Sequence, residues 1–432
     1  MKLTSSVVSA ALALAAVVAT GLNAAPATSA QPPASGHWIA TWTASPQPIW
    51  GREILLPTNI PPRLSRQTIR QVARVSLGGK SARVVLSNEY GGAPVVIGAA
   101  HIARAGSDSA IDIASDLVLR FGGSSTVTIA PGERVVSDPV PLAVAPLSEV
   151  AVTLFLPEPT ALTTFHWDGR DTAYIAKGNV VGARSLVAQQ TISARIFLSD
   201  ILLEAPAGAR AVVILGDSIT DGNGATLDAN RRWPDFLAQR LAKQNVAVLN
   251  AGISGARVLA DGMGESALRR FERDVLSQPH VSTVVLFMGI NDISWPGSAF
   301  APQAPAMSAS ELIAGYRQLI ARAHRKHVRI VAATLTPFAG ALQGTPVWGY
   351  YSADKERVRQ AVNAWIRSSG EFDAVIDFDA VTRDPGSPQR FLPALDSGDH
   401  LHPGDEGNRA MAESVDRHKL FDRLDASRSG LQ

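Results

Sequence analysis

The spacing of apolar residues changes near residue 208, and this change constrains the fold more than any other feature. After residue 208, short apolar runs alternate with stretches that have the apolar spacing of amphipathic helices. The expected strands are residues 211–215, 247–250, 283–288, 330–335 and 374–378. The expected helices include residues 233–243, 266–276, 311–327 and 355–367. Ser308 and Glu311 have the spacing of a capping box at the start of the third helix. Near-continuous apolar strands that alternate with helices predict a parallel sheet covered on both faces.

From about residue 38 to residue 203 the sequence consists instead of short β-prone runs. Two of them, residues 71–77 and 81–87, flank Gly78-Gly79, and this arrangement predicts a β-hairpin. Further runs at 125–129, 149–156 and 188–198 are separated by Pro, Gly and Asp, without a convincing amphipathic helix. A chain of 432 residues also exceeds the usual size of one hydrophobic core. We therefore predict a β-sandwich or jelly-roll domain over residues 36–205 and an α/β domain over residues 206–425.

The first thirty residues have the pattern of a secretory signal peptide. Lys2 is followed by an apolar stretch over residues 7–22 and by small residues up to Ala30. The alternative is a single membrane anchor, but the apolar stretch is short for a bilayer span. We expect a secreted protein, extracellular or periplasmic, with cleavage after Ala27 or Ala30 and no membrane span in the mature chain. Because the sequence has no cysteine, disulfides and cysteine-ligated metals are excluded.

The charge pattern argues against a nucleic-acid partner. The formal net charge is only +2, and no dense run of Lys and Arg is present that could follow a phosphate backbone. Apolar residues make up 46% and charged residues 18% of the chain, which is the balance of a globular protein. The sequence leaves the oligomeric state open.

Ser218 lies directly after the expected strand 211–215, in the turn Gly216-Asp217-Ser218. Chemistry in doubly wound sheets collects at the carboxyl ends of the strands, where a serine would be accessible as a nucleophile. The alternative is an ordinary strand-to-helix turn with Asp or Ser as a helix cap.

Two further strand ends and the C-terminal region favour an acyl-transfer site. The second strand closes with Asn250, followed by Gly252 and Gly255, and Gly289-Ile290-Asn291-Asp292 follows the third. Near the C-terminus the sequence is Asp399-His400-Leu401-His402-Pro403. A serine nucleophile needs a base, and the oxyanion that forms needs hydrogen-bond donors; these segments contain both residue types.

With these segments in order, residues 210–415 resemble the SGNH/GDSL hydrolases. The matching blocks are Gly216-Asp217-Ser218-Ile219, Gly252, Gly289-Ile290-Asn291-Asp292 and Asp399-His400-Leu401-His402. The resemblance implies a flavodoxin-like, three-layer α/β/α domain and a serine esterase that needs no cofactor.

The resemblance also implies a role for each matching residue. Ser218 would be the nucleophile, His402 the general base and Asp399 the residue that orients the imidazole. The oxyanion hole would comprise the backbone N–H groups of Ser218 and Gly252 and the side-chain amide of Asn291. Asp217 and Asp292 are expected to fix turns by accepting backbone hydrogen bonds.

Two ambiguities remain at the C-terminal block. His400 could be proposed as the base, but the spacing of the family favours His402, and His400 is expected to be a surface residue or to line the cleft. The two histidines with Asp396 or Asp399 could also bind a metal, although no third ligand cluster is present, and we expect no metal.

The expected function is hydrolysis of short acyl esters, most simply acetyl esters, of a small-molecule, carbohydrate or lipid substrate. A lipase-like or lysophospholipase-like esterase and an acyltransferase would use the same triad. The non-enzymatic alternative is a carbohydrate-binding protein with a decayed hydrolase domain. The role of the N-terminal β domain and the acyl chain length stay open.

Overall fold

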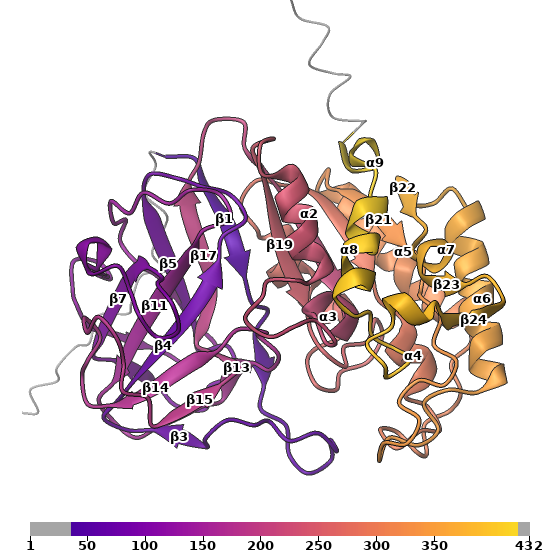
Figure 1. The fold of residues 1–432 in the computed structure, drawn as a ribbon, viewed down its shortest axis with the longest axis horizontal. Coiled ribbons are helices and arrows are strands. Elements are labelled where there is room, and N and C mark those ends of the chain that lie inside the picture. Colours follow the sequence, from indigo (N-terminus) through magenta and orange to yellow (C-terminus); the bar gives the residue numbers. More distant parts are fainter. Residues whose placement is uncertain (1–35, 422–432) are drawn as a thin grey trace, which may run out of the picture. The chain divides into compact units, whose positions relative to one another are not determined.

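The computed structural model describes residues 36–421, and Figure 1 shows their fold. The predicted signal peptide, residues 1–30, lies outside the described residues. Among residues 36–421, no helix combines the length and the apolar character needed to cross a bilayer.

The second half of the chain contains one parallel sheet. Its strands are β18 (Arg210–Gly216), β19 (Val246–Gly252), β20 (Val281–Phe287), β21 (Arg329–Ala333) and β22 (Ala374–Ile376). Their order in the sheet is β19-β18-β20-β21-β22, and every neighbouring pair is parallel. In chain order this is 2-1-3-4-5, the flavodoxin-like doubly wound order, with its switch point between β18 and β20. The predicted parallel sheet is confirmed.

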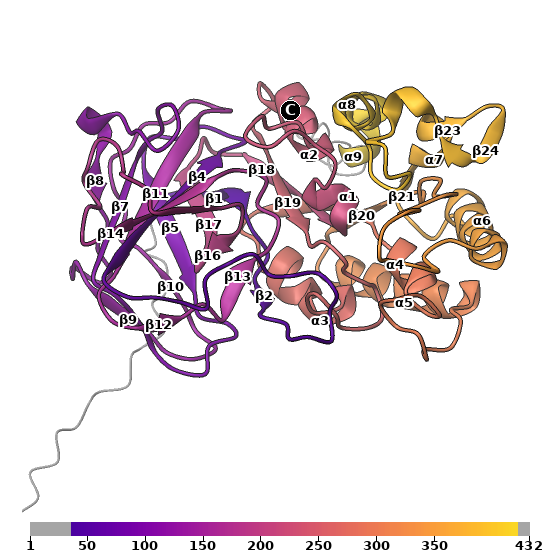
Figure 2. The same cartoon turned by 60° about the horizontal axis from the view of Figure 1, so that its bottom comes forward.

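Helices cover both faces of this sheet, as Figure 2 shows. α2 (Trp233–Leu241) packs beside α8 (Asp405–Ser414) on one face. α3 (Ala267–Phe271), α5 (Ala309–Arg325) and α6 (Ala353–Ser368) form the other layer. The predicted helix at residues 266–276 is α3 continued by a π-helical turn, Glu272–Leu276. Shorter elements are α1 (Ser218–Asp221), α4 (Ile290–Ser294), α7 (Phe378–Thr382), α9 (Arg417–Phe421), β23 (Arg383–Asp384), β24 (Ser387–Phe391) and a 3-10 turn at Pro393–Leu395.

The first half is a β-sandwich of two antiparallel sheets, as predicted. One sheet has the order β1-β17-β5-β10 and the other β15-β14-β4-β11-β7-β8. The strands of the first sheet are β1 (Trp38–Thr43), β17 (Leu198–Glu204), β5 (Ala82–Ser87) and β10 (Arg134–Val136). The strands of the second are β15 (Gln190–Ile192), β14 (Ala173–Lys177), β4 (Gln67–Arg74), β11 (Glu149–Leu156), β7 (Ala99–Arg104) and β8 (Leu117–Val118). Apolar residues of both sheets, including Leu86 and Val152, form one buried cluster.

Short strands and one turn complete this half. They are β2 (Gln47–Pro48), β3 (Arg63–Leu64), β6 (Val95–Ile97), β9 (Val127–Ile129), β12 (Thr160–Ala161), β13 (Thr164–His166), β16 (Arg195–Ile196) and a 3-10 turn at Ile113–Ser115.

The predicted hairpin around Gly78-Gly79 is wrong. β4 pairs with β11 and β14, whereas β5 pairs with β10 and β17, so the two strands belong to different sheets. The connection between them is bonded elsewhere: Ser76 N–H donates to Thr41, and Gly79 pairs with Val144. The Gly-Gly segment therefore carries the chain from one sheet of the sandwich to the other.

The two hydrophobic clusters cross the predicted boundary at residues 205/206. Ile39 and Ala40 of β1 pack into the cluster that contains the parallel sheet. Conversely, Met263, Trp295 and Leu401 of the second half pack into the cluster of the β-sandwich. The domain boundary stays a prediction, but the two halves share their cores.

Candidate active site

Ser218 is presented by a sharp turn at the carboxyl end of β18. The strand ends at Gly216, where a Cβ would lie 2.1 Å from Thr220 Oγ1, so only glycine fits this turn. Asp217 caps α1 by accepting a hydrogen bond of 3.1 Å from Ile219 N–H. Ser218 is the first residue of α1 and lies beside the switch point of the sheet.

Asp399, His402 and Ser218 form a continuous chain of hydrogen bonds. His402 Nε2 lies 2.8 Å from Ser218 Oγ, and His402 Nδ1 lies 2.6 Å from Asp399 Oδ2. Since a carboxylate only accepts, Nδ1 carries the proton, and Nε2 is left to accept the proton of the serine hydroxyl. The arrangement can therefore activate Ser218 as a nucleophile.

The Asp399 carboxylate is held in its charged form. Burial opposes this, but hydrogen bonds from His402 and from the backbone N–H groups of Leu401 and His402 outweigh it. The pKa of Asp399 is therefore well below its usual range. A permanently charged partner stabilises the imidazolium that forms when His402 accepts a proton.

His400 is not brought to Ser218. Its side chain is 44% exposed, and its Nδ1 lies 2.6 Å from Asp396 Oδ2, so it forms a separate pair. Among residues 36–421, no group of three or more His, Cys, Asp or Glu side chains is placed to hold a metal. Of the two histidines, only His402 contacts the serine.

The structure does not support the oxyanion role predicted for Gly252. Its backbone N–H donates to Asn250 Oδ1 at 2.9 Å, and Asn250 Nδ2 donates to Thr220 O at 2.7 Å. Gly252 is still part of β19, so its N–H is used within the strand end and is not free to bind a ligand.

The next turn of the same segment offers a free donor that the sequence interpretation missed. Ile253 N–H donates to Gly216 O at 3.2 Å, and Ser254 N–H donates to Asp221 Oδ2 at 2.8 Å. Gly255 has the left-handed φ of 74°, and its N–H donates to no acceptor within the described residues 36–421. The signal in the sequence was the second glycine after the strand, since a left-handed turn position favours glycine.

Asn291 is held in one orientation by two aromatic side chains. Its Oδ1 accepts hydrogen bonds from Tyr350 OH at 2.7 Å and from Trp295 Nε1 at 3.1 Å. Its Nδ2 donates to Ala256 O at 3.0 Å. Because the amide nitrogen has two protons, one remains available for a ligand.

Asp217 and Asp292 fix backbone turns, as the sequence predicted. Asp292 accepts hydrogen bonds from Val258 N–H at 2.7 Å and from Leu259 N–H at 3.0 Å. Burial raises the pKa of Asp217 to about 7 and that of Asp292 to about 6, against the opposing effect of these backbone donors.

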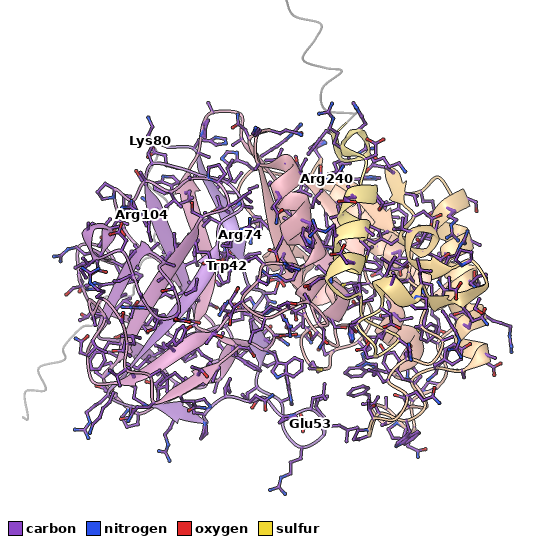
Figure 3. All side chains as sticks on the ribbon, viewed as in Figure 1. Trp42, Glu53, Arg74, Lys80, Arg104 and Arg240 are labelled. Carbon is purple, nitrogen blue, oxygen red and sulfur yellow. The ribbon has the colours of Figure 1, made fainter. Side chains whose placement is uncertain are left out.

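Two cavities are formed by residues 36–421 outside this chain of hydrogen bonds, and neither is lined by Ser218, Asp399 or His402. A small one of about 30 Å³ lies between the β-sandwich and α2, with Trp42 and Arg74 on the sandwich side (Figure 3). It has room for a water molecule but not for a substrate. A larger one of about 520 Å³ is lined mainly by residues 339–351, including Trp348, which is 58% exposed, and Tyr350. Tyr350 connects this second cavity to Asn291.

Residues 214–410 match the model of the GDSL-like lipase/acylhydrolase family. No curated protein matches the chain. A GDSL-like lipase from Bacteroides thetaiotaomicron is 21% identical with a TM-score of 0.39, and the match covers 50% of this chain and 91% of that one. A carbohydrate acetylesterase from Sinorhizobium meliloti is 15% identical with a TM-score of 0.37, over 50% of this chain and 99% of that one. The M. smegmatis aryl esterase is 15% identical with a TM-score of 0.38, over 48% of this chain and 96% of that one.

Sequence identities of 15–21% and TM-scores below 0.4 do not define a substrate. The family match covers β18 to α8, and all four sequence blocks that suggested an acyl-transfer site lie within it. Residues 214–410 of this chain therefore form a GDSL-like lipase/acylhydrolase domain, and the protein is an ester hydrolase.

Proposed function

We propose that this protein is a serine esterase that removes short acyl groups, acetyl above all, through an acyl-enzyme intermediate. The observation that carries the proposal is the hydrogen-bonded chain from Asp399 through His402 to Ser218. This arrangement has the parts of a catalytic triad: an acid, an oriented imidazole and a hydroxyl nucleophile.

In the proposed mechanism, Ser218 Oγ attacks the ester carbonyl carbon while His402 Nε2 takes the hydroxyl proton. His402 then gives this proton to the leaving alcohol, and the acyl group remains bonded to Ser218. Water attacks the acyl-enzyme in the second half of the reaction, with His402 again as the base. Asp399 keeps the proton on Nδ1 and stabilises the imidazolium in both halves.

Three donors are proposed to bind the oxyanion of the tetrahedral intermediate. They are the backbone N–H of Ser218, the free amide proton of Asn291 and, in place of Gly252, the N–H of Gly255. Gly255 follows a turn that is tied to α1 through Ser254, so its N–H is fixed relative to Ser218. Each such donor contributes about 2.7–4 kcal/mol to transition-state stabilisation.

The preference for a short acyl group is supported by the crowding around Asn291. Trp295 is 2% and Tyr350 3% exposed, and both contact the amide that is proposed to bind the oxyanion. Phe300 stacks on Trp295, with the two ring centroids 4.7 Å apart. The cavity next to Tyr350 offers room for the alcohol part of the ester.

A long-chain, lipase-like activity is the second candidate. The large apolar side chains of Ile49, Leu55 and Trp348 are 43%, 51% and 58% exposed, which is the kind of surface that contacts lipid chains.

The test is hydrolysis of p-nitrophenyl esters from acetyl to palmitoyl by wild type, Ser218→Ala and His402→Ala. We expect a maximum at acetyl or propionyl and a loss of about 10⁴-fold or more in kcat in both variants. A long-chain maximum would establish the lipase-like alternative, and a folded Ser218→Ala variant with wild-type activity would refute the serine mechanism.

Secretion is part of the proposal and rests on the signal-peptide pattern of residues 1–30. Expression of the full chain followed by mass analysis of the exported protein tests it. We expect a mature chain that begins after Ala27 or Ala30, and an uncleaved, membrane-attached chain would contradict it.

A further inference from the structure

A buried histidine of the β-sandwich reaches into the hydrolase half at the turn beside the nucleophile. His166 ends strand β13, and its Nε2 lies 2.9 Å from Asp221 Oδ1. The side chains are only 6% and 2% exposed. A buried contact of this kind between residues 55 positions apart is costly unless its hydrogen bonds are complete.

Both ring nitrogens of His166 face acceptors. His166 Nδ1 lies 3.1 Å from Ser45 O, and a carbonyl oxygen can only accept, so Nδ1 carries a proton. Nε2 faces the carboxyl group of Asp221, whose other oxygen accepts two hydrogen bonds from Ser254. With these three polar partners around it, the Asp221 carboxylate has one fixed orientation, and His166 supplies one of the three hydrogen bonds.

Asp221 in turn connects the nucleophile to the turn that carries the oxyanion donors. It is the last residue of α1, whose first residue is Ser218. Its Oδ2 accepts from both the backbone N–H and the hydroxyl of Ser254, each at 2.8 Å. Gly255 follows directly, and Ala256 O accepts from Asn291 Nδ2 at 3.0 Å. One carboxylate therefore fixes the distance between Ser218 and this turn.

We propose that His166 is a positioning residue for hydrolysis: it holds Asp221 and, through Asp221, the turn Ser254–Ala256 in the geometry that binds the oxyanion. This inference rests on the proposed function, because it assigns the oxyanion donors to that turn. If His166 has this role, the β-sandwich positions residues of the active site and does more than stabilise the hydrolase half or bind a separate ligand.

A second contact from the same part of the sandwich reaches the same turn. Gln47 Nε2 donates to Met263 O at 2.7 Å, and Gln47 Oε1 accepts from Trp167 N–H at 2.7 Å. A Cβ on Gly255 would lie 2.5 Å from Met263 Sδ, so Met263 packs directly against this turn. Gln47 thus supports the turn through Met263, while His166 supports it through Asp221 and Ser254.

The test compares two amide replacements, His166→Gln and His166→Asn. The amide nitrogen of Gln reaches about as far as Nε2 of His and can still donate to Asp221. The amide nitrogen of Asn reaches about as far as Nδ1 and retains only the contact with Ser45 O. Both variants keep a polar side chain of similar character, so the comparison separates the two hydrogen bonds of His166.

We expect His166→Asn to lower kcat on p-nitrophenyl acetate by about 10–100-fold with little change in KM, since complete loss of one oxyanion donor costs about 10²–10³-fold. His166→Gln should restore most of this loss. His101→Gln is the matched control: His101 Nδ1 lies 2.8 Å from Asp116 Oδ2 in the sandwich, and Gln, whose amide nitrogen takes the place of Nε2, removes this contact. Its kcat should equal that of wild type.

Each variant is assayed well below its own Tm, measured separately, so that a general loss of stability is not counted as a loss of catalysis. Equal kcat values for His166→Asn and His166→Gln, or a loss confined to KM or Tm, would overturn the proposal. Ser218→Ala in the same assay tests the proposed function independently, since wild-type activity there would refute the serine mechanism whatever His166 does.

Discussion

The helix-covered faces of the parallel sheet and the loops at its carboxyl end are stabilised in different ways. The faces are covered by apolar side chains of α2, α5, α6 and α8, which form a cluster with the strands themselves. The loops pack instead on the β-sandwich: Met263, Trp295 and Leu401 share a cluster with Trp50 and Phe165 of that half. The loops at the catalytic end of the sheet therefore pack on the sandwich core, whereas the cluster on the sheet's faces is built mainly by the helices, with Ile39 and Ala40 of β1 added from the sandwich.

Two arginine side chains show a related difference. Arg270 is fully buried near the carboxyl ends of β18 and β19, where it donates to Gly216 O, to Ala251 O and to Ser45 Oγ of the sandwich. Arg270 lies on α3, where that helix meets the strand ends, whereas Arg317 on α5 pairs with Glu371 at the surface, with 56% of its side chain exposed. We therefore expect changes to the loops, and to groups such as Arg270 that hold the strand ends, to affect catalysis, while changes on the outer side of the helices should affect stability alone.

The largest expected effect is that of Asp399→Asn. The asparagine oxygen can still accept the backbone hydrogen bonds, but it no longer stabilises the imidazolium of His402, and kcat should fall by about 10⁴-fold. Steady-state hydrolysis of p-nitrophenyl acetate measures this change. The matched control is Asp396→Asn, which removes the partner of His400 and should leave kcat within a few fold of wild type. Equal losses in the two variants would show that the base is wrongly assigned.

Arg270→Leu should have the largest effect on stability. Removal of one partner from a buried ion pair costs about 3–5 kcal/mol, and the lower end applies because Arg273 still pairs with Asp274. The free energy of unfolding in urea measures the cost, and kcat should fall as well because two strand ends beside Ser218 lose a donor. Arg317→Leu, in contrast, should leave both the free energy of unfolding and kcat close to those of wild type, because solvent screens this exposed pair. A similar cost for both would contradict the comparison.

Asp217→Asn should change how stability depends on pH. Burial raises the pKa of Asp217 to about 7, whereas an unfolded chain has a value near 4, so the folded state binds this proton more tightly. The stability that this provides is present below pH 4 and is lost as the pH rises to about 7. Asparagine does not titrate, and we expect the Tm of the variant, relative to wild type, to be higher at pH 8 than at pH 5 by roughly 2–4 °C or more. A difference in Tm that is the same at both pH values would show that Asp217 is charged throughout this range.

Most of the hydrolase half could be predicted because its signals are local. Alternating apolar strands and amphipathic helices predict a parallel sheet, and Ser218 and Asn291 follow β18 and β20, neighbours in the sheet whose carboxyl ends lie side by side. His402 follows no strand of this sheet, so its place at the site is not predicted by the sheet topology. The choice of His402 over His400 came from spacing, and only the contact at 2.8 Å between His402 Nε2 and Ser218 Oγ distinguishes the two in space.

The features that were missed depend on contacts between distant segments. The strands at residues 71–77 and 81–87 have the pattern of a hairpin, but their hydrogen bonds go to other strands of two different sheets. The family resemblance implied Gly252 as an oxyanion donor, and only the structure shows that the Asn250 side chain accepts the hydrogen bond of its N–H. His166 lies in no recognisable motif. Its role depends on a contact with Asp221, which belongs to the other half of the chain, and the sequence alone does not show this contact.

The smallest expected effect is that of Ser308→Ala, at the start of α5 in the helical layer. Ser308 Oγ accepts from Glu311 N–H at 3.2 Å, and Glu311 Oε2 accepts from Ser308 N–H at 3.0 Å, so the substitution removes one half of a capping box. Loss of such a cap costs about 1 kcal/mol of stability, measured by urea unfolding. Glu311→Gln is the control, because its amide oxygen can still accept from Ser308 N–H and should preserve stability. Neither variant should change kcat, since α5 packs on the face of the sheet; a loss of activity in Ser308→Ala would mean that the helical layer, and not only the β-sandwich, holds the catalytic loops in place.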